Sequence, residues 1–257
     1  MMMRMFTRNH VTLCILAAVS AAGLYAQKPV FTEDFESGKL DPAVWDQRTQ
    51  GVATIAVQQD QAAHGKYALQ VHYPEMAPAS FAFIVNPHLP DGVKTHLFGR
   101  AYVKISAAIP PSHTVLTLAG AAGWPLSKFE EIGMQKATFQ PSYQENKSAR
   151  GQGRGEDVRH AEAPPFDKWF LLEWEFNDKP STLTIWVDGQ LSHMIQGDEK
   201  TDFASFQWPK GSGTVDDLVG GFSEAGFGAR VWGAVPQAFD VFYDDIAIGT
   251  SRLGPVK

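Results

Sequence analysis

The sequence predicts an all-β fold, either an antiparallel sandwich or a barrel. Short runs rich in β-branched and aromatic residues recur along the chain, and clusters such as Asn86-Pro87 and Asp188-Gly189 separate them. No helical period is sustained over three turns, and there is no internal repeat. Many short strands between turn residues are typical of sandwiches and barrels. The expected strands are residues 31–38, 81–85, 97–105, 115–119, 132–139, 169–176, 183–187, 218–222 and 239–248.

Two of these runs alternate clearly between apolar and polar residues. Since successive side chains of a strand point to opposite faces, alternation predicts one buried and one exposed face. The residues predicted to face the core are Phe170, Leu172, Trp174, Phe176, Leu183, Ile185 and Val187. Glu173 and Trp186 are expected on the opposite, more polar face. Trp186 either packs under a loop there or forms a stacking surface for a sugar.

The first 26 residues have the pattern of a secretory signal peptide. Arg4 and Arg8 precede the apolar run 11–19, and small residues follow up to Ala26. The run is too short to span a bilayer comfortably. We therefore expect residues 1–26 to be removed, residues 27–257 to form one β domain, and the protein to be secreted or periplasmic.

The remaining 231 residues carry 20 basic and 28 acidic side chains, because Arg4 and Arg8 lie in the leader, which gives a net charge of −8. This charge disfavours nucleic acid or an anionic membrane surface as a partner. The single cysteine, Cys14, also lies in the leader. Without disulfides, the fold must be held by its core, with or without a metal.

Acidic residues cluster in the first and the last expected strands. Asp244 and Asp245 interrupt an apolar run, and Glu33, Asp34 and Glu36 lie near the start of the domain. In jelly rolls the first and last strands often lie close together, and neighbouring carboxylates there would repel each other. Calcium accepts such oxygen ligands, so a calcium site is one interpretation. The alternative is that the aspartates cap a solvated strand edge.

Two further features could carry chemistry. The polar, Gly-rich segment 143–160 places four basic residues in one stretch: Lys147, Arg150, Arg154 and Arg159. It either binds carboxylates of an acidic sugar polymer or is a solvated loop. His113 opens the expected strand 115–119 and is either a general base or a surface residue.

An ordered set of motifs extends over essentially the whole chain after the leader. It consists of Asp34-Phe35-Glu36-Ser37-Gly38, Ala63-His64-Gly65, Arg100-Ala101-Tyr102-Val103-Lys104-Ile105, His113, Ile132-Gly133-Met134-Gln135, Glu173-Trp174, Ile185-Trp186-Val187-Asp188-Gly189 and the block 243–254. This set resembles that of the secreted cellulose-induced proteins of wood-degrading fungi, which are related to glucuronan lyases. The terminal block, which contains Asp244-Asp245-Ile246 and Ser251-Arg252, is its most specific part.

The resemblance implies a concanavalin-like β-jelly-roll sandwich of two antiparallel sheets, with a concave sugar-binding face and a structural calcium. The implied metal ligands are Glu36 and Asp244, together with backbone carbonyls of the turn from His64 to Tyr67. We expect a monomer whose partner is a plant or microbial cell-wall polysaccharide.

The lyase groups implied by the resemblance are His113 as base, Gln135 as the partner of the substrate carboxylate and Tyr143 as proton donor. The expected substrate-binding residues are Trp186, Glu173, Arg150 and Asp157, the last in the long polar segment. The sequence departs from the family pattern at two positions. Glu131 stands where the family has an arginine, and Phe129 stands where it has a histidine.

These features predict a secreted, calcium-stabilised protein that cleaves uronic-acid-containing glycans by β-elimination. A carboxylate at residue 131 would repel a uronate, which favours the alternative of a non-catalytic carbohydrate-binding protein. An adhesion or interaction domain is a third possibility.

Overall fold

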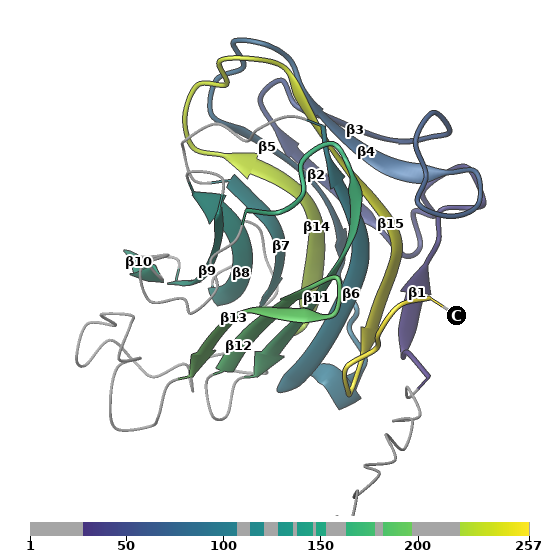
Figure 1. The fold of residues 1–257 in the computed structure, drawn as a ribbon, viewed down its shortest axis with the longest axis vertical. Coiled ribbons are helices and arrows are strands. Elements are labelled where there is room, and N and C mark those ends of the chain that lie inside the picture. The colour runs from purple at the N-terminus through teal and green to yellow at the C-terminus, as the bar shows by residue number, and fades with distance from the viewer. Residues whose placement is uncertain are drawn as a thin grey trace, which may run out of the picture.

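The computed structural model describes residues 28–106, 114–120, 128–135, 138–145, 148–152, 163–177, 182–196 and 222–256. These residues form two antiparallel sheets packed face to face, which confirms the predicted all-β jelly-roll sandwich (Figure 1). The eight-stranded sheet consists of β1 (Phe31–Glu33), β3 (Thr54–Gln58), β4 (Ala68–Tyr73), β6 (His96–Ile105), β11 (Trp169–Asn177), β12 (Thr182–Val187), β13 (Gln190–Gln196) and β15 (Phe239–Gly249). The seven-stranded sheet consists of β2 (Asp46–Gln50), β5 (Ser80–Asn86), β7 (Thr114–Gly120), β8 (Lys128–Gln135), β9 (Thr138–Glu145), β10 (Ser148–Gln152) and β14 (Glu224–Val231).

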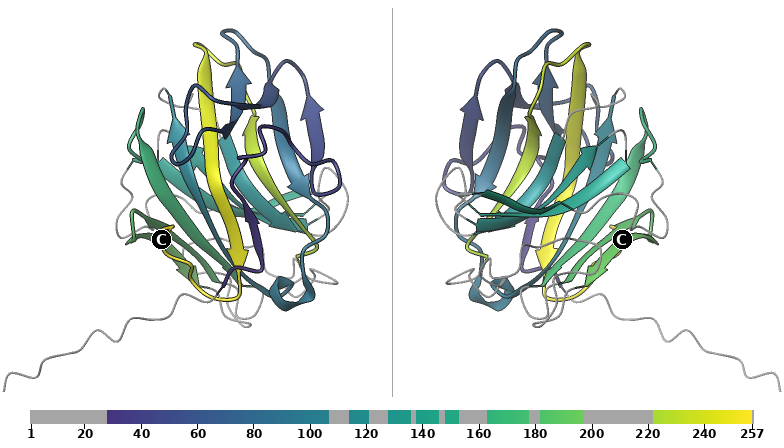
Figure 2. Two further views of the ribbon diagram at one scale, coloured as in Figure 1. Left: turned by 90° about the vertical axis from the view of Figure 1, so that its right-hand side faces the viewer. Right: turned by 90° about the vertical axis from the view of Figure 1, so that its left-hand side faces the viewer.

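Strand order places the end of the chain in the middle of the eight-stranded sheet. The order is β13-β12-β11-β6-β15-β4-β3, and β1 also pairs with β15. The other sheet has the order β10-β9-β8-β7-β14-β5-β2. Figure 2 shows the two layers from opposite sides, with β15 in front in one view and β8 and β9 in front in the other. One short 3₁₀ helix, η1 (Asp91–Val93), precedes β6.

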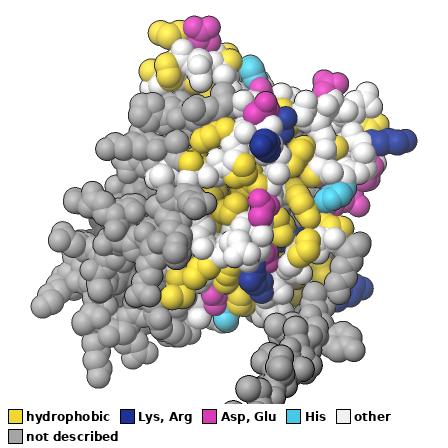
Figure 3. All heavy atoms as spheres, in the orientation of Figure 1, with side chains coloured by type: hydrophobic (Ala, Val, Ile, Leu, Met, Phe, Trp, Pro, Cys, Tyr) yellow, Lys and Arg dark blue, Asp and Glu magenta, His cyan; other side chains and the backbone are white. Residues whose placement is uncertain are grey.

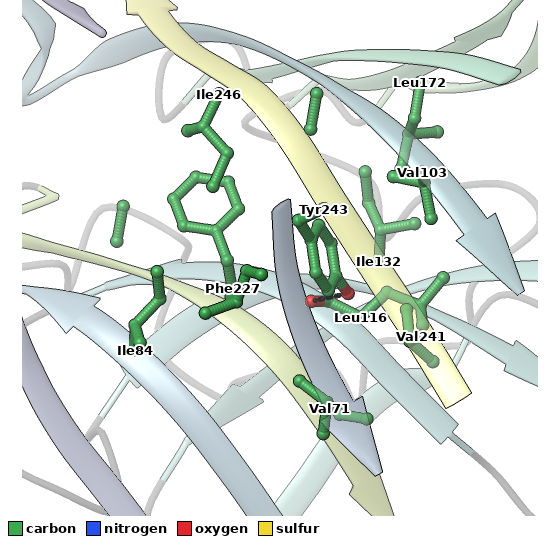
Figure 4. Close-up of a cluster of buried hydrophobic side chains, with 14 of the residues drawn as sticks. Val71, Ile84, Val103, Leu116, Ile132, Leu172, Phe227, Val241, Tyr243 and Ile246 are labelled. Carbon is green, nitrogen blue, oxygen red and sulfur yellow. Dashed lines mark hydrogen bonds between the residues drawn. The ribbon is translucent and has the colours of Figure 1, made fainter. Parts of the chain in front are cut away.

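The core between the sheets is aromatic and aliphatic (Figure 4). The inward faces predicted for residues 169–176 and 183–187 are confirmed, since their apolar residues are buried in the core or packed against it. Gly99 lies opposite Trp174, and a Cβ atom at residue 99 would lie 2.1 Å from the indole ring. Glycine at this position therefore gives the buried tryptophan its space.

Two buried tyrosines join the eight-stranded sheet to a bulged part of the other sheet. The Tyr243 hydroxyl lies 2.8 Å from the Leu116 carbonyl oxygen and 2.6 Å from that of Gly228. The Tyr73 hydroxyl lies 2.8 Å from the Ala229 carbonyl oxygen and also contacts a carbonyl of β5. The register shifts at these places in β7 and β14, where bulges leave carbonyl groups outside the regular ladder. The two phenols therefore satisfy carbonyls that the bulges expose in a dry core.

The sequence prediction was wrong about some strands. Residues 132–139 do not form one strand, because β8 ends at Gln135 and β9 begins at Thr138, and the two pair antiparallel. Part of the segment predicted as a polar loop is strand, since β9 extends to Glu145 and β10 pairs with it. The expected strand 218–222 lies almost entirely outside the described residues. Strand β14 was not predicted, because glycine and alanine make up half of it.

No helix among the described segments has the length and apolar character needed to cross a membrane.

Candidate functional site

The first candidate site is a turn held by two carboxylates from opposite ends of the chain. Glu36 Oε1 accepts hydrogen bonds from the backbone N–H groups of Lys66 and Tyr67, at 2.8 and 2.9 Å. Asp244 Oδ2 accepts from the N–H groups of Ala63 and His64, at 2.8 and 3.0 Å. The structure thus brings together the predicted metal-binding residues Glu36, His64, Tyr67 and Asp244.

A bulge in β15 explains how two adjacent aspartates serve the same turn. The register with β6 shifts between Asp244 and Ala247, and Asp245 has a positive φ of 47°. Residues next to each other in a regular strand would point to opposite faces. Here Asp244 is buried and binds the turn backbone, while Asp245 Oδ2 contacts His64 Nδ1. Residue 64 is therefore held through both its backbone and its side chain.

The charge balance of this turn suits a cation. The pKa of Asp244 is raised to about 6, chiefly by burial and also by the charge of Asp245, although the N–H groups of His64 and Ala63 act in the opposite direction. The two N–H bonds to Glu36 lower the pKa of that carboxyl group. Glu36 Oε2 has no hydrogen-bond partner in the described part of the chain and is open to a ligand. Among the described residues, however, no three His, Cys, Asp or Glu side chains form a ready cluster for a metal. Backbone oxygens would have to complete the coordination of a calcium ion.

The second candidate site is an edge of the seven-stranded sheet where β7 begins and β8 and β14 end. Thr114 pairs with both Met134 of β8 and Val231 of β14. Gln135 thus ends its strand beside the first residue of β7. The core side of β8 holds Ile132 and Met134, so Glu131 and Gln135 have the register positions of the opposite, outer face.

Tyr143 has a different register position from Gln135. It pairs with Glu130 on β8 and with Arg150 on β10. Tyr143 has the register position of the same sheet face as Phe139, which lies in the core. Gln135 has the register position of the opposite face, together with Glu131. Backbone register therefore places Tyr143 beside Arg150, but not in the row of Gln135. His113 and Asp157 lie outside the described residues, so their roles stay predictions.

Glu131 shares this surface with a cation from another strand. Glu131 is fully buried, and its negative charge raises the pKa of Arg230 on β14, although burial of the guanidinium lowers that pKa more strongly. Arg230 belongs to the row of paired residues that runs from Phe81 through Val115 to Gly133. Its guanidinium lies 3.6 Å from the ring centroid of Trp232.

The predicted substrate-binding residues Glu173 and Trp186 lie on the other sheet and are engaged by the C-terminal segment. Glu173 is 1% exposed, and its carboxylate binds Arg252 through both oxygens at 3.1 and 2.7 Å and also accepts from the Gly254 N–H. The Arg252 guanidinium lies 4.5 Å from the ring centroid of Trp186. Of the two interpretations of Trp186, the structure therefore favours packing under a loop.

Nearby polar groups on this sheet are also paired within the protein. His96 and Thr184 both bind Glu175, and Arg100 Nη1 donates to the Gly254 carbonyl oxygen. On the described part of the face seen in Figure 3, acidic and basic side chains are interspersed without a large region of one sign. The bond from Arg100 helps to hold the segment 250–256, and the polar groups named here are engaged within the protein.

Sequence reasoning missed Arg230 and Trp232. They lie in a Gly- and Ala-rich strand and its following loop, and this segment showed no strand pattern. The available signal was an arginine and a tryptophan two residues apart. Residues at i and i+2 of a strand share a face, so this spacing would place both side chains on one surface.

Comparisons with known proteins agree with this geometry. Residues 34–251 match the family model described as Cip1-like, core domain, of the polysaccharide lyase-like group. The solved structure of "Cellulose induced protein, Cip1" superposes with a TM-score of 0.66 at 18% identity, covering 88% of this chain and 100% of that chain. An endo-β-1,4-glucuronan lyase from the fungus Trichoderma reesei superposes with a TM-score of 0.56 at 15% identity, covering 87% of this chain and 96% of that chain. No curated protein matches the sequence.

The two superpositions show the shared jelly-roll fold, and the family match covers most of the chain. The resemblance recognised from the sequence motifs is confirmed: the chain belongs to the Cip1-like family of the polysaccharide lyase-like group.

Proposed function

We propose that the protein is a secreted, calcium-stabilised enzyme that cleaves uronic-acid-containing polysaccharides by β-elimination. The observation that carries this proposal is the meeting of strand ends at one sheet edge, where Thr114 pairs with Met134 next to Gln135. His113 precedes Thr114 in the sequence. The family relationship, which includes a glucuronan lyase among the similar structures, supports the same reaction.

The reaction needs three groups with distinct tasks. His113 would remove the C5 proton of a uronate, which becomes acidic when its carboxylate charge is stabilised. Gln135 would donate hydrogen bonds to that carboxylate as negative charge develops. The C4–O4 bond then breaks as the C4–C5 double bond forms, and O4 takes a proton. Tyr143 was the expected donor, but its backbone register has the phase of Phe139 in the core, so we assign this proton to solvent water instead.

The test of this function is an eliminative assay on glucuronan, alginate and xylan, which follows the ultraviolet absorbance of unsaturated uronates. We expect turnover on at least one uronate polymer. His113→Ala should lower kcat by about 10²- to 10⁴-fold, the usual contribution of a general base. His72→Ala is the matched control, because His72 pairs with Asp240 on the other sheet. If no polymer yields unsaturated product at any pH in the presence of calcium, the protein is not a lyase.

A second candidate function is carbohydrate binding without cleavage. The observation in its favour is Glu131, a buried carboxylate at the position where the family pattern has an arginine. Affinity electrophoresis on acidic and neutral glycans separates the two functions, because a binding protein is retarded by a polymer that stays intact.

The proposed calcium would be held by Glu36 and Asp244, with carbonyl oxygens of residues 64–67, and would neutralise the acidic turn. We expect a chelator to lower the melting temperature by roughly 5 to 10 °C if calcium is present at about a hundred times its dissociation constant. Asp244→Ala should abolish this sensitivity to the chelator. Asp240→Ala is the control on the same strand, because Asp240 binds Gln70 and His72 instead. Equal melting of the native protein with and without chelator would reject a structural calcium.

A further inference from the structure

We propose that Arg230 and Trp232 form a subsite for a uronate residue of the glycan, in which Arg230 binds the sugar carboxylate and Trp232 stacks on the sugar ring. Arg230 lies near the end of β14, the strand that meets β7 at the candidate catalytic edge, and Trp232 directly follows that strand. This inference rests on the proposed function, since it assigns a substrate-binding role on the same surface.

The Arg230 guanidinium differs from the other arginines of the described chain in its hydrogen bonding. Arg48 forms two hydrogen bonds with Glu224, Arg252 forms two with Glu173, and Arg100 donates to a backbone carbonyl. Within the described part of the chain, Arg230 has no hydrogen-bonded acceptor and no ion-pair partner at contact distance. It is half-buried, and none of its nitrogens is among the fully buried, unpartnered polar atoms of the described chain, so its donors are not sealed away from a ligand. A bidentate carboxylate from a ligand would supply the missing acceptors.

Trp232 holds this guanidinium in place and remains accessible. It is the one aromatic side chain among the large exposed apolar residues of the described chain, with 47% of its surface exposed. The guanidinium covers one ring face at 3.6 Å from the centroid, which restricts the arginine through a cation–π contact. The exposed fraction leaves part of the indole accessible beside the guanidinium. That surface can stack against the apolar face of a sugar.

The bulge in β14 is rigidly supported at this position. The carbonyl oxygens of Gly228 and Ala229, just before Arg230, contact the buried hydroxyls of Tyr243 and Tyr73. A bulge fixed in this way directs the following side chain, as bulges beside binding sites commonly do. Arg230 is therefore preorganised for a ligand.

The position of the subsite fits the departure of this chain from the family pattern. In the row Arg230–Val115–Gly133, β14 and β8 are separated by β7, so their backbones lie about 10 Å apart. Gln135 lies two residues beyond Gly133 on β8. The arginine that the family has at residue 131 is thus replaced by a cation from a different strand, close enough for its charge to interact with Glu131.

The test compares two ligands that differ in one group. Glucuronan oligosaccharides carry a carboxylate on each sugar, and cello-oligosaccharides of the same length carry a hydroxymethyl group there. Binding is measured by isothermal titration calorimetry in a His113→Ala background, so that the acidic ligand is not cut. We expect Arg230→Gln to weaken binding of the acidic ligand by about 10- to 100-fold and to leave the neutral ligand within about twofold. Trp232→Ala should weaken both ligands.

Two further variants identify the cause of any loss. Arg230→Lys keeps the charge but loses the planar fork, so it should restore only part of the selectivity. Arg48→Gln removes an arginine that is already paired with Glu224 on the same sheet, and it should leave the ratio of the two affinities unchanged. Melting temperatures verify that each variant is folded.

Each outcome has a definite meaning. If Arg230→Gln retains native selectivity for the acidic oligosaccharide, or loses affinity equally for both ligands, the subsite is wrong. In that case eliminative activity of the native protein would still stand as the proposed function. If the native protein cleaves no polymer but Arg230→Gln shows the selective loss, the subsite is supported and the lyase reaction fails. A native protein that binds neither ligand overturns both.

Discussion

Replacing Arg252 with alanine is expected to lower the free energy of unfolding by about 3 kcal/mol, because it leaves the Glu173 carboxylate buried without its cation. Glu173 is 1% exposed, and among the described residues it retains only the Gly254 N–H as a hydrogen-bond donor in this variant. The segment 250–256 should also detach from the sheet, since Arg252 contacts Trp186 and the Gly189 carbonyl. Urea denaturation followed by tryptophan fluorescence measures the change.

Two comparisons sharpen this experiment. Lys94→Ala removes a cation whose partner, Asp91, is almost fully solvated, so its effect should stay within about 0.5 kcal/mol. The double variant Arg252→Ala/Glu173→Leu should be more stable than Arg252→Ala, because the Glu173 carboxylate is no longer buried without Arg252. A loss below about 1 kcal/mol for Arg252→Ala would mean that water replaces the guanidinium, and that the buried ion pair does not hold the tail.

Replacing Tyr243 with phenylalanine should lower the free energy of unfolding by about 2 kcal/mol, because it removes the one proton shared by the Leu116 and Gly228 carbonyl oxygens. Both acceptors lie in a core that excludes water, and burial raises the pKa of Tyr243 well above its ordinary value. The substitution changes no apolar volume. The loss therefore reports on the hydrogen bonds alone.

Tyr102→Phe is the matched control for this substitution. Tyr102 lies on β6 with its ring against His64, and its hydroxyl forms no hydrogen bond with any described residue. Its effect should be within about 0.5 kcal/mol. Chemical denaturation of both variants gives the comparison, and equal stability of the two would show that the bulge carbonyls need no tyrosine.

The sequence predicted the fold best where a strand is buried on one face and polar on the other. Residues 169–176 are of this kind, and the structure confirms which of them face the core. Strand β2 escaped prediction because all five of its residues are polar and it lies at a sheet edge. Strand β14 was not predicted, because Gly228 lacks a side chain and weakens the strand pattern. The structure explains why residue 228 is a glycine. A Cβ there would lie 2.1 Å from the Ala82 carbonyl oxygen.

The candidate site was predictable only in part. The neighbourhood of Glu36 and Asp244 followed from acidic residues in the first and last strands, because strand pairing between β1 and β15 brings these ends together. The contact of Arg252 with Trp186 could not be predicted from the sequence, since the C-terminal segment that carries Arg252 has no periodic pattern. Arg230 could not be foreseen as a cation near Glu131, because their charge interaction depends on strands separated by about a hundred residues in sequence.

The central place of β15 has a consequence for the order in which the chain can fold. This strand is the last in sequence, yet it lies between β6 and β4 and also pairs with β1. Three earlier strands therefore lack their partner until residues 239–249 leave the ribosome. Proteins dominated by such distant pairings fold slowly, on the order of milliseconds to seconds. Until then the apolar edges of β4 and β6 are open to other chains, so efficient synthesis should depend on a chaperone that shields them.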